Sequence, residues 1–124
     1  MEMPEEQRMY VRSVFTPLRL MAGNRDPVSL AVYVSNKSRD IRNYSVTIKV
    51  PTIFGFDRTG LMHDQRNRIR AVQPGQVGET AFTIYPKYGV KHGFYPFSVL
   101  VREHDERFDK TIDEKALETK LRVE

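Results

Sequence analysis

The sequence predicts an all-β domain built as a β-sandwich. Several short stretches alternate apolar and polar residues, turn residues separate them, and no long stretch keeps the helical period of about 3.6 residues. The 124 residues suffice for one domain with its own core, and the hydrophobic fraction of 40% and charged fraction of 29% are ordinary for a globular protein. We expect a flexible tail over residues 1–8 and a single domain over residues 9–124.

The first half of the chain contains three predicted strands. MYVRSVF and PLRLM, on either side of Pro17, read as one broken strand that switches between sheets. VSLAVYVS (residues 28–35) and YSVTIKV (residues 44–50) alternate between an apolar and a polar face, which is typical of half-buried strands. The polar NKSRDIRN between them is typical of a turn connection.

Four further strands are expected in the second half. One lies near residues 66–72, and the Pro74-Gly75 pair after it suits a type II turn, since proline fixes φ and glycine accepts a positive φ. ETAFTIYP, the stretch Tyr95–Val101 and LETKLRV follow with the same alternation. DEKALETK contains good helix formers and alternatively forms one helical turn.

Seven short strands in slightly more than 100 residues are typical of an immunoglobulin-like fold, so we predict a seven-stranded, mainly antiparallel sandwich. Gly93, Tyr95 and Phe97 sharpen this prediction, because immunoglobulin-like domains place a tyrosine near the start of the sixth strand, where it bonds back to the backbone. Pro96 cannot donate to a β-ladder, so we expect it near the beginning of its strand, with the missing donor facing away from the neighbouring strand.

The order of these motifs resembles the cell-adhesion-related CARDB domains and other Ig-like modules of bacteria and archaea. The residues that carry the resemblance are Val34-Ser35-Asn36, Gln73-Pro74-Gly75-Gln76 and Gly93-Phe94-Tyr95. It covers roughly residues 28–102. The resemblance implies a non-enzymatic spacer or adhesion module that binds a protein partner. The missing cysteines and tryptophan depart from antibody-like domains.

Composition limits the chemistry and the compartment. Because the chain has no cysteine, it forms no disulfide and no cysteine-ligated metal site. The acidic MEMPEEQRMY is unlike a signal peptide, and no window reaches the roughly 18 apolar residues of a membrane span. We therefore expect a cytoplasmic protein or an excised domain of a surface protein. The net charge of +4 favours weak attraction to polyanions.

Two groups of residues are candidate partner-binding sites. Arg66, Arg68 and Arg70 alternate along a predicted strand and therefore share one face, which suits phosphate or acidic partners. Alternatively they form a solvated face whose charges guard a sheet edge. Phe54 and Phe56 lie in a long loop, where they either anchor a partner or plug one end of the sandwich.

Catalytic patterns are weak. His63-Asp64 and His104-Asp105-Glu106 place acids beside histidines, but adjacent strand residues point to opposite faces, so we interpret both as surface loop residues. We predict no enzyme activity, no cofactor and no metal site. The predicted function is a protein-binding or adhesion module; the alternative is binding of nucleic acid or anionic lipid through the arginine face. Homodimerisation by pairing of exposed sheet edges is a third hypothesis.

Overall fold

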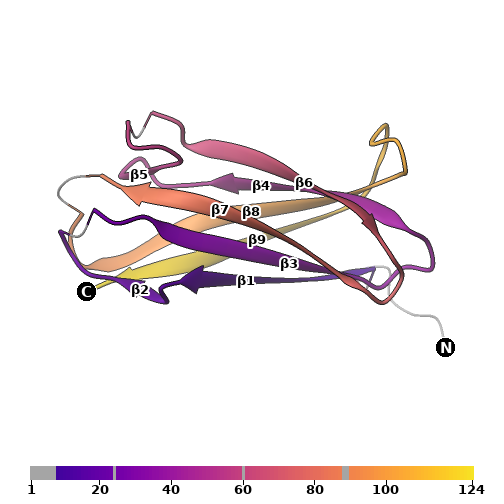
Figure 1. The fold of residues 1–124 in the computed structure, drawn as a ribbon, viewed down its shortest axis with the longest axis horizontal. Helices are drawn as coiled ribbons and strands as arrows, with labels where there is room; N and C mark the ends of the chain where they lie inside the picture. Colours follow the sequence, from indigo (N-terminus) through magenta and orange to yellow (C-terminus); the bar gives the residue numbers. More distant parts are fainter. Residues whose placement is uncertain (1–7, 24, 60, 88–89) are drawn as a thin grey trace.

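The computed structural model describes residues 8–23, 25–59, 61–87 and 90–124, which form two β-sheets packed face to face (Figure 1). None of the described residues belongs to a helix long and apolar enough to cross a bilayer. The strands are β1 (Met9–Thr16), β2 (Arg19–Leu20), β3 (Val28–Asn36), β4 (Arg42–Lys49), β5 (Phe54–Gly55), β6 (Asp64–Val72), β7 (Val77–Pro86), β8 (Gly93–His104) and β9 (Thr111–Val123).

The first sheet has the strand order β1-β3-β7-β5 and the second the order β2-β9-β8-β4-β6. Every pairing is antiparallel except that of β2 with β9, which is parallel. This arrangement confirms the predicted Ig-like sandwich. The number of strands differs from seven because the broken first strand divides into β1 and β2 around Pro17, and because the two-residue β5 lies in a segment that we expected to be loop.

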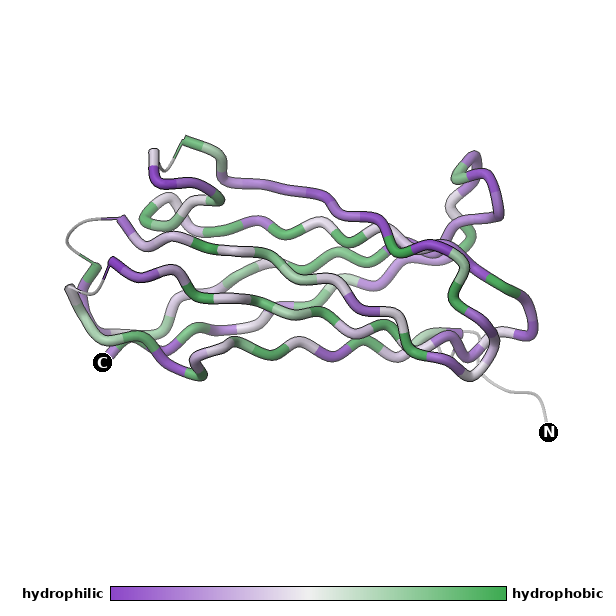
Figure 2. Tube along the Cα trace, in the orientation of Figure 1, coloured by the Kyte–Doolittle hydropathy of each residue, from purple (hydrophilic) through white to green (hydrophobic). Residues whose placement is uncertain are grey.

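Hydrophobic and hydrophilic residues alternate along several strands (Figure 2), and the apolar residues of these strands are the buried ones. Phe97 of β8 is fully buried, with its ring centroid 5.3 Å from that of Phe15 and 5.2 Å from that of Phe54. The predicted inward faces of the early strands are confirmed, since Tyr44, Val46 and Ile48 of β4 have no exposed surface. DEKALETK lies in β9, so the helical alternative for that stretch is wrong.

Two local sequence signals also have the predicted structure. Gly75 has a φ of 79° in the turn after β6, where the Gln76 amide donates to the Gln73 carbonyl. The Tyr95 hydroxyl donates to the Lys91 carbonyl at 2.7 Å, which is the bond expected of a tyrosine corner. Pro96 lies where β8 pairs with β9 alone, because the pairing with β4 begins at Ser98.

A buried carboxylate fixes the chain at the end of the sandwich where β1 begins. Glu103 has no exposed surface and lies between two arginines, Arg8, which precedes β1, and Arg42 at the start of β4. The Arg8 guanidinium donates two hydrogen bonds to this carboxylate, and Arg42 Nε lies 3.2 Å from it. Residues 1–7 of the expected tail lie outside the described residues, whereas Arg8, placed in the same tail, is held by Glu103.

Replacing Glu103 by glutamine is expected to lower the free energy of unfolding by about 3 kcal/mol, because Arg8 loses its counter-charge and Arg42 keeps only its ion pair with the exposed Asp40. Urea denaturation of both proteins at neutral pH measures this difference. Glu124→Gln is the matched control: the arginines that pair with Glu124 are exposed, so its loss should cost less than about 1 kcal/mol. Equal costs for the two substitutions would contradict the proposed stabilising role of Glu103.

Candidate functional site

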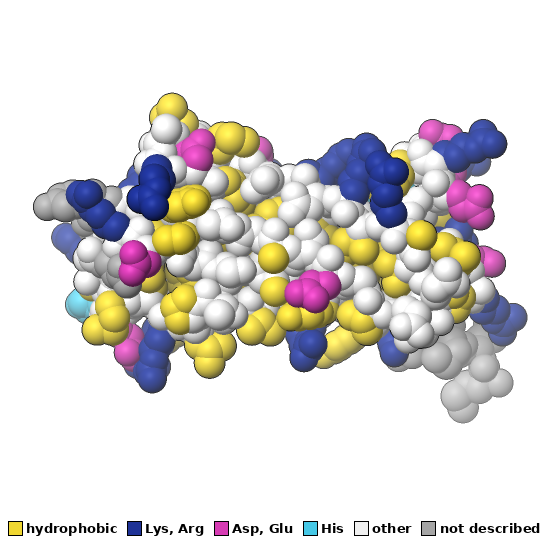
Figure 3. All heavy atoms as spheres, in the orientation of Figure 1, with side chains coloured by type: hydrophobic (Ala, Val, Ile, Leu, Met, Phe, Trp, Pro, Cys, Tyr) yellow, Lys and Arg dark blue, Asp and Glu magenta, His cyan; other side chains and the backbone are white. Residues whose placement is uncertain are grey.

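The three predicted arginines share one surface. β6 is an edge strand of the second sheet, and Arg66, Arg68 and Arg70 point outward from it, because Asn67 and Ile69 point inward. Residues two apart in a strand are separated by about 6.6–6.8 Å. The three guanidinium groups therefore form a row, which we call the arginine row, and a cluster of basic side chains is visible above β6 (Figure 3).

The arginine row carries unneutralised charge. Within the part of the chain that the structure describes, none of its three side chains forms an ion pair. Across the sheet, Arg66 lies opposite Thr47 and Arg68 opposite Ser45, so the neighbouring β4 positions are uncharged. Such a row of exposed cations attracts polyanions, and the attraction weakens as salt is added.

Phe108, which the sequence interpretation missed, covers one end of the arginine row. The guanidinium carbon of Arg68 lies 4.5 Å from the centre of its ring, and that of Arg70 lies 5.8 Å away. The His104 ring is 5.2 Å from the same ring. Because Phe108 already contacts the two arginines and His104, it is not free to stack on a nucleic-acid base. The stacked guanidinium groups keep their N–H edges available to oxygen ligands.

A polar cluster lies beneath Phe108. Ser45 Oγ and His104 Nε2 are 2.7 Å apart, and His104 Nδ1 lies 3.3 Å from the Lys110 carbonyl oxygen. The carbonyl can only accept, so Nδ1 carries the proton and Nε2 accepts from the Ser45 hydroxyl. The interpretation of His104 as a surface loop residue is wrong: it lies in β8 and is 7% exposed, because the β8–β9 loop folds over it.

This serine–histidine pair resembles a nucleophile with its base only in its hydrogen bond. Ser45 is 2% exposed, so its hydroxyl is closed to a substrate in this structure. Among the described residues, no three His, Asp or Glu side chains lie close enough together to hold a metal ion. The cluster instead ties the β8–β9 loop to the sheet.

The phenylalanines proposed as partner anchors lie inside. Phe54 has no exposed surface, and its ring contacts Tyr95 and Phe97, which fits the alternative in which this loop plugs one end of the sandwich. Phe56 is half-buried, with its ring centroid 6.2 Å from that of Phe82. The exposed apolar side chains of the same loop are Leu61 and Met62.

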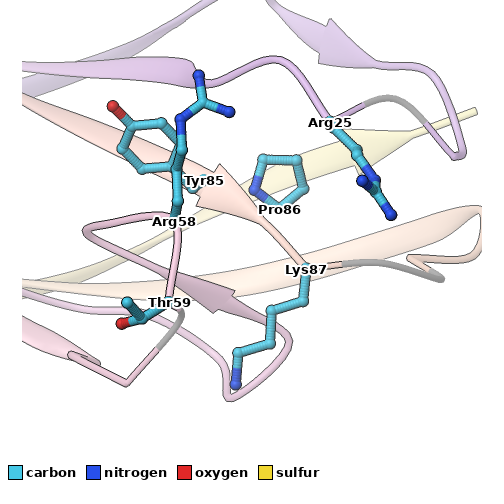
Figure 4. A pocket seen from close by; sticks show the side chains of 6 residues that line it. All are labelled: Arg25, Arg58, Thr59, Tyr85, Pro86 and Lys87. Atoms are coloured by element: carbon cyan, nitrogen blue, oxygen red, sulfur yellow. The ribbon is translucent and has the colours of Figure 1, made fainter.

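A basic hollow lies at the same end of the sandwich, between the β5–β6 loop, the β2–β3 loop and the end of β7. Arg58 lies over the Tyr85 ring, with its guanidinium carbon 5.5 Å from the ring centre. In Figure 4 the charged ends of Arg25, Arg58 and Lys87 point away from one another, so they do not converge on one ligand. The hollow is lined by Arg25, Arg58, Thr59, Tyr85, Pro86 and Lys87.

The longest open sheet edge belongs to β9. This strand pairs with β8 along its length, but β2 covers only Arg122 and Val123 on the other side. The described structure therefore leaves residues 111–121 without a second neighbouring strand. An open edge presents a row of unpaired backbone N–H and C=O groups, which can pair with another chain.

Comparisons with solved structures identify proteins that share the fold. No family model matches the sequence, and no curated protein matches it. Solved structures with a similar fold include the major pilin subunit of Bacillus cereus (TM-score 0.64, 8% identity, 93% of this chain but 40% of the pilin chain). The self-complemented major subunit of the Myf fimbriae of Yersinia enterocolitica matches with a TM-score of 0.53 and 17% identity, over 92% of this chain and 98% of the fimbrial chain. A Pyrococcus furiosus CARDB domain in complex with di-metal ions matches with a TM-score of 0.53 and 13% identity, over 93% of this chain and 86% of the CARDB chain.

These similarities confirm that the protein is an Ig-like β-sandwich and that the CARDB resemblance extends to its fold. At such low identities they show the fold alone, because one fold carries many functions. The function must therefore be argued from the surfaces of this chain. The two candidate surfaces, the arginine row and the open edge of β9, lie on opposite sides of the second sheet.

The polar cluster predicts a pH dependence of stability. Burial lowers the pKa of His104, and the nearby Arg66, Arg102 and Arg68 lower it further. The unfolded chain therefore binds a proton more readily than the folded one, so the free energy of unfolding should fall as the pH drops below about 6.5. Urea denaturation at pH values from about 7.5 to 5 measures this slope.

His104→Gln should reduce that slope, because glutamine does not titrate. His92→Gln is the control, since His92 is exposed and its removal should leave the slope unchanged. A slope that is the same in the wild type and in the His104 variant would show that His104 does not control the response.

Proposed function

We propose that this protein is a non-enzymatic interaction module that binds an extended polypeptide strand along the open edge of β9. The single observation that carries the proposal is the stretch of β9 over residues 111–121, whose second side has no neighbouring strand in the described structure. Addition of a strand to an exposed sheet edge is a general mode of peptide recognition, in which backbone hydrogen bonds supply much of the affinity.

The position of β2 identifies the backbone groups that a partner would use. The Glu124 amide donates to the Leu20 carbonyl, and the Ala22 amide donates to the Glu124 carbonyl, so residue 124 directs both of its backbone groups away from β8. Backbone groups alternate sides along a strand. The even-numbered residues from 114 to 122 therefore direct their N–H and C=O groups to the side of β9 that lies away from β8. The alternation is interrupted at residue 112, where the pairing with β8 shifts, and the Glu114 amide donates to Asp113 Oδ1.

The other strand edges are less accessible to an added strand. Asn67 Nδ2 of β6 donates to the Ala81 carbonyl of β7, which covers part of the second side of β7. A Cβ atom built on Gly78 would lie 2.5 Å from Ile69 Cγ2, so β6 and β7 approach too closely there for another strand to enter. β1 is open but spans 8 residues, against the 13 of β9.

Ala116→Pro tests this proposal. The substitution removes an N–H that faces the open edge rather than β8, so the fold should survive while strand addition is lost. The probe is a displayed library of linear peptides selected on the wild type. We expect selected peptides to bind the wild type and to lose at least tenfold in affinity for the variant, because the proline interrupts the new ladder.

The control compares the two sides of the same strand. Thr119→Pro removes an N–H that faces β8, so it should destabilise the domain, whereas Ala116→Pro should leave the thermal unfolding temperature within a few degrees of the wild type. A selection that yields no peptide whose binding depends on Ala116 would contradict the proposal.

The arginine row supports a second candidate function, the binding of a polyanion. The specific observation is that its side chains form no ion pair among the described residues while Phe108 holds Arg68 and Arg70 in place. Because Phe108 is occupied, phosphate groups rather than bases would be recognised. We therefore expect little preference between single-stranded DNA and anionic lipid vesicles of equal charge density.

Binding through the arginine row should weaken steeply with salt, since each neutralised phosphate releases counterions. Fluorescence anisotropy with a labelled oligonucleotide at several salt concentrations measures the slope. Replacing Arg66, Arg68 and Arg70 together by serine should weaken binding at least tenfold and flatten the slope. An unchanged affinity in that variant would exclude the arginine row as the binding surface.

A further inference from the structure

We infer that the strand bound by β9 is β9 of a second copy of this chain, paired antiparallel about a two-fold axis that passes through Leu117. The inference rests on the proposed function, because it needs the same open edge. It goes further by naming the occupant and the register. The charges along the edge and the length of the open stretch together select the register.

The geometry of a symmetric pair limits the registers to a few. Residues directly opposite each other in an antiparallel pair point to the same face of the sheet. Two identical strands related by a two-fold axis must therefore be centred on a residue. The candidate centres within the open stretch lie between Lys115 and Thr119, because a centre nearer either end of that stretch would leave few even-numbered residues in the pairing.

Charge distinguishes these centres. A centre at Ala116 places Glu114 opposite Glu118 of the other copy, and a centre at Glu118 places that residue opposite itself. A centre at Lys115 likewise puts two lysines face to face. Like charges directly opposite each other destabilise a strand pair.

The two remaining centres both oppose unlike charges and differ in the length of the pairing. A centre at Thr119 also opposes unlike charges, because it places Glu118 opposite Lys120 twice. It leaves only residues 117–121 in the pairing, however, since it brings Ala116 opposite Arg122, which already pairs with Arg19 of β2. A centre at Leu117 uses only the open stretch. It places Glu114 opposite Lys120 twice, once on each side of the axis, and gives Glu118 the small, uncharged Ala116 as its partner. Glu114 already lies 3.0 Å from Arg102 Nε of its own copy, so Lys120 would be its second cationic partner.

Backbone bonding agrees with the same centre. The even-numbered residues face the open edge, so Glu114 with Lys120 and Ala116 with Glu118 become the hydrogen-bonded pairs of the new ladder. The Glu114 amide would exchange its present bond to Asp113 Oδ1 for one to Lys120. The two copies of Leu117 form a non-hydrogen-bonded pair, with Cα atoms about 4.5 Å apart. Leu117 is half-buried against the core, so the pairing would also cover its exposed part.

The charged edge also explains why the pairing would stop at two copies. Asp113 and Lys115 belong to the inward-facing set of β9 and are half-buried, and inward-pointing charges discourage unspecific edge pairing. Once two β9 edges have paired, that edge is used up. A closed two-fold dimer follows rather than a fibre.

A cysteine scan tests the register directly, because the wild-type chain has no cysteine. Leu117→Cys should form a covalent dimer on mild oxidation, since opposed non-hydrogen-bonded residues meet the disulfide requirement of a Cα separation of about 4.4–6.8 Å. Thr119→Cys is the matched control, because in this register it faces Lys115 and lies far from its own copy. Non-reducing electrophoresis reads the result.

Sedimentation equilibrium measures the dimer without relying on a cysteine. Ala116→Pro should make the protein monomeric, and Lys120→Glu should raise the dimer dissociation constant about tenfold by opposing two glutamates at both ends. The double variant Glu114→Lys with Lys120→Glu opposes unlike charges across the axis again but loses the Arg102–Glu114 ion pair within each copy, so its dissociation constant should fall below that of Lys120→Glu alone. Lys91→Glu, the same change of charge at an exposed loop residue, should leave the wild-type value unaltered.

Each result decides a separate question. A wild type that stays monomeric at millimolar concentration overturns the dimer, whereas peptides that bind the same edge would still support the proposed function. A dimer that survives Ala116→Pro overturns β9 as the interface. A dimer that is sensitive to the proline but crosslinks at Thr119 rather than at Leu117 overturns the register.

Discussion

The ladder between β8 and β9 is the interaction on which the rest of the structure depends. It pairs Gly93 with Val123 at one end and His104 with Thr111 at the other, with one irregularity next to His104. Because this ladder uses the odd-numbered backbone groups of β9, it leaves the even-numbered ones pointing away from β8. The strand that completes the sheet therefore also defines its open edge.

The second sheet separates the two candidate surfaces. Its strand order, β2-β9-β8-β4-β6, places the arginine row at one edge and the open side of β9 at the other. Between them, Glu103 and the Ser45–His104 pair occupy opposite faces of the sheet near the same end, and each joins segments far apart in the sequence. These buried polar groups hold the framework, so substitutions on either edge can be tested without disturbing the other.

Much of the fold could be predicted from local patterns. The alternation in β3, β4 and β8 identified their buried faces, the Pro74-Gly75 pair identified a turn, and Tyr95 identified the corner. β9 was ambiguous because its helix-forming residues compete with the period of two, and only its pairing with β8 decides the outcome. The two-residue β5 was missed, since a strand that short carries no periodic signal.

The candidate sites were less predictable. The outward row of arginines followed from strand alternation alone. Phe108 could not be found in this way, because its contacts with Arg68 and His104 depend on how the β8–β9 loop folds back over the sheet. The sequence allowed Phe54 to be either a partner anchor or a plug of the sandwich end, and only its burial in the structure distinguishes the two. The open edge of β9 required the strand order, which is a property of the whole chain and of no single motif.

Residue-resolved amide hydrogen exchange across β9, at low and high protein concentration, tests the central claim most directly. In dilute solution the amides of Ala116, Glu118 and Lys120 should exchange much faster than those of Leu117 and Thr119, because only the latter bond to β8. At high concentration the even-numbered amides should become protected as well. Even-numbered amides that are already protected in dilute solution would contradict an open edge.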